Sequence, residues 1–140
     1  MVRDYHDDRI PTVYSRSDLP WIDRRDGVTQ AYFRGLDIVV GFTHIEPGAA
    51  GGFHDHPWEQ ITMIQSGACT FHVGSEAVAV EAGDMFVVPP DVPHYAEPDE
   101  GPCLLCFISP LREDFLPQLT HQTEFHRLDI DPPEDDGETA

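Results

Sequence analysis

The chain has 140 residues, which is enough for one domain with its own hydrophobic core. Its formal net charge is -18, and all eight Lys or Arg positions hold arginine, so we expect its surface to repel nucleic acids and anionic membranes. No apolar run approaches the roughly 20 residues of a membrane span, and the first residues lack the apolar region of a signal peptide. We therefore expect a cytoplasmic protein without a nucleic-acid or membrane partner.

Short apolar segments alternate with turn signals along most of the chain. Residues 1–30 are polar and interrupted by prolines, and we predict an N-terminal arm there. The predicted strands are, in chain order, 30–34, 36–45, 59–65, 68–73, 77–80, 85–88, 94–97 and 104–109, with a helical turn at 112–116. We assign residues 31–117 to a β-barrel domain. The high charge and low hydrophobicity of residues 118–140 are typical of a disordered acidic tail.

Three potential metal ligands lie close together in the sequence: His54, His56 and Gln60. They are two and four residues apart. In an extended strand, residues at even offsets point to the same face. If the strand runs regularly through Pro57, we expect all three side chains to point the same way.

A fourth candidate ligand, His94, follows a second glycine- and proline-rich segment. Three imidazoles and one amide oxygen suit one divalent metal ion such as Zn, Ni, Mn or Fe, and the sequence does not distinguish among these metals. Many short strands without a long helix indicate an antiparallel sandwich or barrel. A metal site on inward-facing residues favours, among these, an all-β jelly roll with an open mouth.

These two segments resemble the two sequence motifs of the cupin superfamily. His54 and His56 occupy the His-x-His of the first motif, and Gln60 stands where an acidic ligand is usual. His94 occupies the histidine of the second motif, in which Asp91 replaces a glycine. The resemblance implies a cupin-type double-stranded β-helix, which is a jelly-roll barrel, and a metal bound by these three histidines and Gln60.

The ligand set resembles that of one subset of small single-domain cupins. This subset includes KdgF-like proteins, which help to open unsaturated uronate sugars, polyketide cyclases and BacB-like isomerases. The segment Ser109–Phe115 resembles the KdgF-like ending, Ser-Pro-x-Arg-Glu-Asp-aromatic. In that group Asp-x-Phe comes before the Ser-Pro, whereas this chain has Cys106–Ile108 there. The carboxylate that the resemblance places beside the metal is therefore missing.

Two further residues are candidates for the chemistry. His44, in phase with Phe42, would be a general base if it points inward, and a core or interface histidine is the alternative. Arg112 would anchor a substrate carboxylate by a bidentate contact, or form a surface ion pair instead. Cys103 and Cys106 have the spacing of a redox or zinc pair, but an offset of three puts them on opposite strand faces. We predict that both are buried reduced thiols.

We expect a metal-dependent cupin enzyme that performs isomerisation, ring-opening or cyclisation, without redox chemistry, on a small carbonyl or sugar-derived substrate. The metal would act as a Lewis acid. Two alternatives stay open: an iron- or nickel-dependent dioxygenase, and a non-catalytic cupin that binds a small ligand. The N-terminal arm and the habit of related cupins lead us to expect a homodimer.

Overall fold

Nine strands and two short 3-10 helices make up the computed structural model, which describes residues 13–49 and 52–122. The elements are η1 (Arg16–Asp18), β1 (Ile22–Arg25), β2 (Val28–Arg34), β3 (Ile38–Ile45), β4 (Gln60–Ser66), β5 (Ala68–Val73), β6 (Glu76–Glu81), β7 (Met85–Val88), β8 (His94–Pro98), β9 (Cys103–Pro110) and η2 (Glu113–Gln118). Every predicted strand is present, with ends that differ from the prediction by at most two residues. Strand β1 was not predicted.

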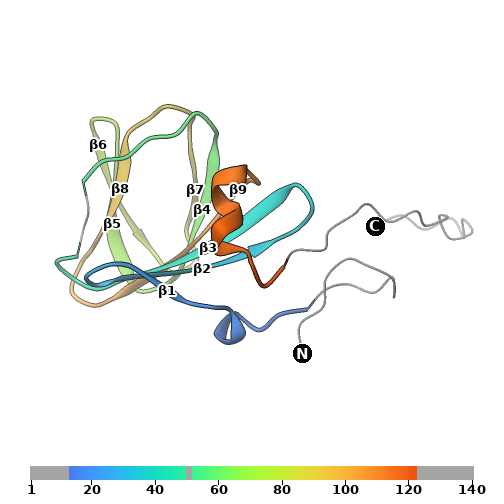
Figure 1. Ribbon diagram of the computed structural model, residues 1–140. Coiled ribbons are helices and arrows are strands. Elements are labelled where there is room, and N and C mark those ends of the chain that lie inside the picture. The colour runs from blue at the N-terminus through green and yellow to red at the C-terminus, as the bar shows by residue number, and fades with distance from the viewer. Residues whose placement is uncertain (1–12, 50–51, 123–140) are drawn as a thin grey trace, which may run out of the picture.

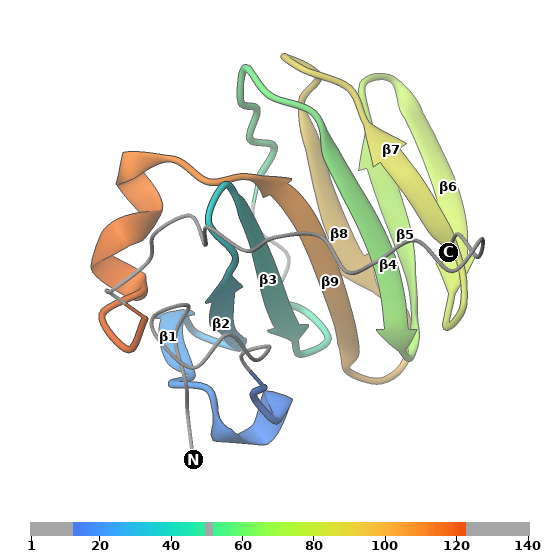
Figure 2. The same cartoon turned by 90° about the vertical axis from the view of Figure 1, so that its right-hand side faces the viewer.

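The strands form two antiparallel sheets that face each other (Figure 1). The larger sheet has the order β1-β2-β3-β9-β4-β7, and the smaller one has the order β6-β5-β8. Figure 2 shows the larger sheet in a second view, in which η2 (orange) lies to the left of β2 and β3. Two facing antiparallel sheets with crossover connections confirm the predicted all-β jelly roll.

The core lies between the two sheets and follows from side-chain alternation. In β3, Val39, Gly41, Thr43 and Ile45 are buried, and the residues that alternate with them are less so. A cluster of buried side chains joins the sheets: Val28, Ile45, Ile64, Cys69, Cys103 and Leu105. Full burial of each large apolar side chain contributes roughly 1.5–3 kcal/mol to stability. Cys103 and Cys106 are free and buried, which confirms the prediction of reduced thiols.

The ends of the described chain add to the barrel. Strand β1 falls within the segment that we expected to be an arm, and it pairs with β2 at the edge of the larger sheet. At the other end, Leu119 and Gln122 are buried. The Gln122 side chain accepts a hydrogen bond from the backbone N–H of Arg34 and donates one to its carbonyl. Packing thus continues past the boundary predicted at residue 117. Residues 1–12 of the predicted arm and residues 123–140 of the predicted tail lie outside the described residues.

No helix in the described ranges has both the length and the apolar character needed to cross a membrane.

Candidate metal centre

Backbone hydrogen bonds place His54 directly beside His94. The N–H of His94 donates to the carbonyl of His54 over 2.9 Å, and the N–H of His54 donates to the carbonyl of His94 over 3.2 Å. This reciprocal pair is one rung of an antiparallel ladder, in which opposite residues share a face. The two imidazole ring centres are consequently 4.3 Å apart, although 39 positions separate the residues in the sequence.

His56 reaches the site from a loop and not from a regular strand. The chain bends at Pro57 and Trp58, and β4 begins at Gln60. The chain does not run regularly through Pro57, so the condition attached to the prediction that all three side chains point the same way is not met. The N–H of Asp91 donates to the carbonyl of His56 over 2.7 Å and fastens this loop to the one before β8. Asp91 has φ 63°, a left-handed conformation that explains why the motif usually has glycine there.

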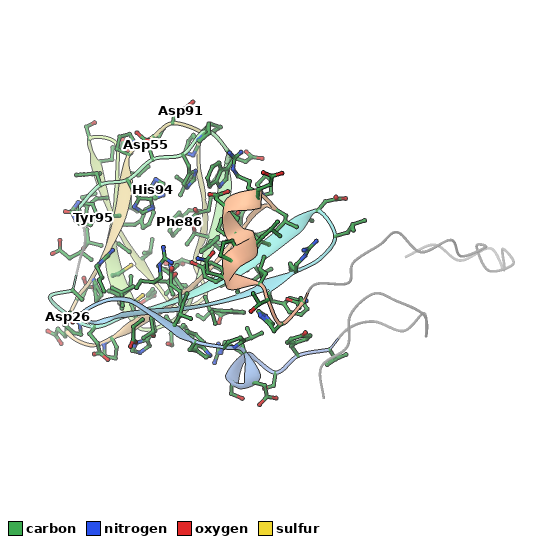
Figure 3. The ribbon with its side chains drawn as sticks, in the orientation of Figure 1. Asp26, Asp55, Phe86, Asp91, His94 and Tyr95 are labelled. Atoms are coloured by element: carbon green, nitrogen blue, oxygen red, sulfur yellow. The ribbon has the colours of Figure 1, made fainter. Side chains whose placement is uncertain are left out.

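The three predicted histidines converge as the sequence motif implies. The potential ligand atoms of His54, His56 and His94 all lie within 4.8 Å of one another. The Oε1 atom of Gln60 is 3.1 Å from Nε2 of His56. In Figure 3, His94 lies between the two sheets, near the end of the barrel where the loops with Asp55 and Asp91 run.

Backbone carbonyls fix which ring nitrogen faces the site. The Nδ1 atom of His94 is 2.8 Å from the carbonyl of Val92, and Nδ1 of His56 is 2.8 Å from the carbonyl of Trp58. A carbonyl can only accept, so each Nδ1 carries the proton and donates. Each Nε2 is then left with its lone pair directed toward the site, which is the usual arrangement in metal-binding histidines.

The donor set fits a divalent metal ion. Nε2 of His94 is buried and has no hydrogen-bond partner in the described structure. The amide nitrogen of Gln60 donates to Oγ1 of Thr62 over 2.9 Å, so its oxygen faces the lone pair of His56 Nε2. Two acceptors in contact repel each other unless a cation lies between them. His54, His56, His94 and Gln60 would therefore hold the metal, in agreement with the prediction that the site binds one.

The imidazoles of His54 and His94 are neutral at physiological pH, as metal ligation requires. Desolvation, and then the neighbouring rings of His94 and His56, lower the pKa of His54 to about 4. Desolvation also lowers the pKa of His94, against the opposing effect of its hydrogen bond to the Val92 carbonyl. The identity of the metal does not follow from these ligands, because imidazole and amide oxygen suit several first-row ions.

The ligands open into a cavity of about 480 Å³ between the sheets. This volume is typical of sites for small molecules. Its wall includes a polar chain in which the Tyr32 hydroxyl donates to Gln30, whose amide nitrogen donates to Thr43 over 2.9 Å. Burial raises the pKa of Tyr32, so its phenol stays protonated as a donor. Phe71 and Phe107 supply part of the apolar lining.

The structure corrects the expectation that His44 points inward. Thr43 and Ile45 line the cavity, so the alternation of β3 places His44 on the outer face of the sheet. Its Nδ1 lies 3.9 Å from a carboxylate oxygen of Glu46, and it borders a separate surface hollow. In this position His44 cannot reach a substrate beside the metal ligands.

Arg112 does not line the cavity. It forms the ion pair that the sequence analysis gave as the alternative to a substrate contact. Its guanidinium lies 4.4 Å above the ring centre of Trp58, and its Nε is 3.5 Å from Oδ1 of Asp114. His56 also contacts the Trp58 ring and stacks on it at 4.4 Å and 9°. Arg112 therefore touches the site through Trp58, and Asp114 lines the cavity in its place.

Strand β9 presents apolar side chains to the cavity. Leu105 and Phe107 line it, whereas Cys106 lies on the opposite face of the strand, across from Phe42 and Met63. Position 106, where the KdgF-like resemblance places a carboxylate, therefore points away from the histidines. No acidic side chain of β9 lies beside the metal ligands.

The sequence missed two arginines of the site, Arg24 and Arg25, which line the cavity from the edge strand β1. Their segment, Asp23–Asp26, is charged throughout, and such a segment is typical of a solvated turn. The residues alone carry no signal that this segment is a strand of the barrel.

The comparisons agree with this fold and site. The Cupin domain family matches residues 41–109, a segment that contains all four proposed ligands. The chain belongs to the cupin superfamily. An RmlC-like cupin from Shewanella frigidimarina is 26% identical, with a TM-score of 0.66 over 73% of this chain and 93% of that one. No curated protein matches the chain.

Two further solved structures are similar. KdgF from Halomonas sp. is 25% identical, with a TM-score of 0.66 over 73% of this chain and 97% of that one. The polyketide cyclase RemF from Streptomyces resistomycificus has a TM-score of 0.64 over 74% of this chain and 81% of that one. RemF is 17% identical, so this likeness concerns the fold alone.

Proposed function

We propose that the chain is a metal-dependent enzyme that isomerises, opens or cyclises a small carbonyl or sugar-derived compound without redox chemistry. The observation that carries the proposal is the convergence of three imidazoles and one amide oxygen at a cavity of about 480 Å³. A metal held there supplies Lewis-acid polarisation of a carbonyl or enol oxygen. Because Gln60 is neutral where an acid is usual, the ligands remove less of the positive charge that polarises the substrate.

The residues of the cavity would divide the remaining work. Tyr32 and Thr43 offer hydroxyl groups that orient a polar substrate, and Phe71 and Phe107 exclude water from it. Proton transfer falls to a carboxylate, because the imidazoles are committed as ligands and His44 lies outside. Asp55, next in sequence to His54, and Asp114 are the two carboxylates that line the cavity. The similarity to KdgF supports a non-redox reaction as the first choice among cupin chemistries.

The first test is elemental analysis of the protein purified without added metal, beside His94→Ala and Gln60→Ala variants. We expect about one divalent ion per chain in the wild type, and we expect His94→Ala to lose it. His44→Ala is the matched control, since it removes an imidazole from the outer face and should retain the ion. A wild-type chain that binds no metal even after reloading contradicts the proposal and favours a ligand-binding cupin.

The second test follows proton exchange. The metal-loaded protein is incubated in D2O with enolisable carbonyl compounds, beginning with dihydroxyacetone and levulinate, and deuterium incorporation next to the carbonyl is measured by NMR. We expect incorporation that requires His94 and proceeds without O2 uptake. Oxygen consumption instead would favour the dioxygenase alternative.

A further inference from the structure

The edge strand β1 carries two consecutive arginines that both line the cavity, Arg24 and Arg25. In a regular strand, consecutive side chains point to opposite faces. The pairing of β1 with β2 is irregular at this point, because Asp23 lies opposite Thr29 and Arg25 lies opposite Val28. Two residues of β1 are thus accommodated beside one position of β2, which defines a β-bulge at Arg24.

The bulge explains why both guanidinium groups face inward. Val28 is buried and lines the cavity, and cross-strand partners share a face, so Arg25 points inward. Thr29 borders the outer hollow that His44 also borders, so its partner Asp23 points outward. Normal alternation after Asp23 turns Arg24 inward. The bulge then places the next residue, Arg25, on the same inward face. Bulges at barrel rims and beside active sites commonly redirect side chains in this way.

The charges of the two arginines affect the pKa values of two other residues that line the cavity, Tyr32 and His54. Burial raises the pKa of Tyr32, and the charge of Arg24 opposes that rise. Desolvation and the neighbouring imidazoles lower the pKa of His54, and the charge of Arg25 adds to the effect. One arginine therefore lies near the polar wall, and the other lies near a metal ligand.

Neither arginine is neutralised by an ion pair in the described structure. The carboxylates that share the cavity are Asp55 and Asp114, and Asp114 lies against Arg112. A chain of net charge -18 has abundant acidic groups with which to pair its arginines. Two adjacent guanidinium groups that line one cavity and form no ion pair in the described structure are therefore suited to an external anion.

We propose that Arg24 and Arg25 form an anion-binding subsite, and that the substrate is a carbonyl compound that also carries a carboxylate or phosphate group. The assignment of a substrate rests on the proposed function; the anion subsite itself does not need a reaction. Guanidinium groups bind both kinds of oxyanion through paired N–H donors. The subsite would hold the anionic end of the substrate while the carbonyl end reaches the histidines.

The test compares two ligands that differ in charge and hardly in shape. Levulinate carries a ketone and a carboxylate, and levulinamide replaces the carboxylate with a neutral amide. Dissociation constants are measured by NMR titration of the protein as purified. We expect levulinate to bind at least about tenfold more tightly than levulinamide, as charge-assisted hydrogen bonds from arginine imply. Equal affinities, or no binding of levulinate, overturn the proposal.

Variants locate the binding. We expect Arg24→Gln and Arg25→Gln each to weaken levulinate binding about tenfold without affecting levulinamide. Arg16→Gln is the matched control, because the Arg16 guanidinium lies over the Phe42 ring on the outer face, 5.9 Å from its centre. Equal losses in Arg16→Gln and in the two cavity variants would show a general effect of net charge and overturn the subsite.

Two further measurements complete the test. Inorganic phosphate is added as a competitor for levulinate. If phosphate displaces levulinate at a phosphate concentration below the dissociation constant of levulinate, the natural substrate is a phosphate ester. If phosphate fails to displace levulinate, the natural substrate is a carboxylate. Metal content and deuterium exchange are measured on the same samples. A normal metal content with no preference for levulinate overturns the subsite alone, and a preference for levulinate without metal or exchange overturns the enzyme proposal alone.

Discussion

His56 shows how this chain positions a candidate metal ligand on a loop. Its Nδ1 donates to the Trp58 carbonyl, and its ring stacks on the Trp58 indole at 4.4 Å. The Arg112 guanidinium also contacts the indole. These contacts hold the imidazole in one orientation, whereas an isolated antiparallel bridge positions His54 beside His94.

The stack predicts that Trp58 supports metal binding without touching the metal. Trp58→Ala should raise the dissociation constant of the metal about tenfold, because residues that orient a ligand typically contribute 10- to 100-fold in affinity. Trp58→Phe keeps an aromatic face against His56 and should retain most of the affinity. Competition titration with a chelating dye measures both. Unchanged affinity in Trp58→Ala would show that the backbone contacts of His56 suffice.

The convergence of the three histidines could be predicted from the sequence, whereas the positions of His44 and Arg112 outside the cavity lining could not. His54, His56, Gln60 and His94 follow from the motif spacing, which depends on residue type and order. His44 was misplaced because an alternating pattern gives the phase of a strand without saying which face is inside. In β3 both faces carry large side chains, so hydrophobicity does not separate them.

At the scale of elements, β3 and β9 pack closely where Gly41 meets Phe107. The two residues are cross-strand partners, and the Phe107 ring lies directly over Gly41. A Cβ on Gly41 would overlap the ring. Phe107 also lines the cavity, so the glycine sets the position of part of the cavity wall.

This contact predicts that Gly41→Ala destabilises the fold. Overpacking a well-filled core typically costs about 1–3 kcal/mol, so the free energy of unfolding in urea should fall by that amount. The matched control is Gly101→Ala, since a Cβ there meets no atom within 4 Å. Wild-type stability of the Gly41→Ala variant would mean that the Phe107 ring moves aside easily. Because Phe107 lines the cavity, a change in the affinity for levulinate would then show that the cavity wall has moved.

Strands were predictable where turn signals bound them, and β1 was not. The glycine and proline turns between β4 and β9 fix those strands to within two residues. Strand β1 spans four residues, three of which are charged and exposed, so neither periodicity nor hydrophobicity marks it. The bulge that turns two arginines inward depends on tertiary pairing with β2, which no local pattern encodes.

At the scale of the molecule, a row of apolar side chains crosses the outer face of the larger sheet. Phe33 pairs with Val40, Val40 with Ile108, Ile108 with Ile61, and Ile61 with Val87. Ile61 is 42% exposed and Val87 is 56% exposed. The row spans five strands and carries no charge.

We propose that two copies of the chain pair through this row. Two molecules of net charge -18 repel each other, so contact is most favourable where the surface is uncharged. A twofold axis brings one patch against the same patch of the second copy, which suits a continuous apolar row. Burial of this row would also remove exposed apolar area from water.

Light scattering after size exclusion tests the pairing. The wild type should elute as a species of twice the 15.7 kDa chain mass. Val87→Glu places a charge at the exposed end of the row and should give monomers, because two buried carboxylates would face each other across the axis. Ala79→Glu adds the same charge to the outer side of the smaller sheet, since Ala79 lies opposite Thr70 on β5, and should leave the dimer intact. A monomeric wild type would show that the acidic surface keeps the copies apart. Equal dissociation of the dimer in both variants would show that the contact between the copies lies elsewhere.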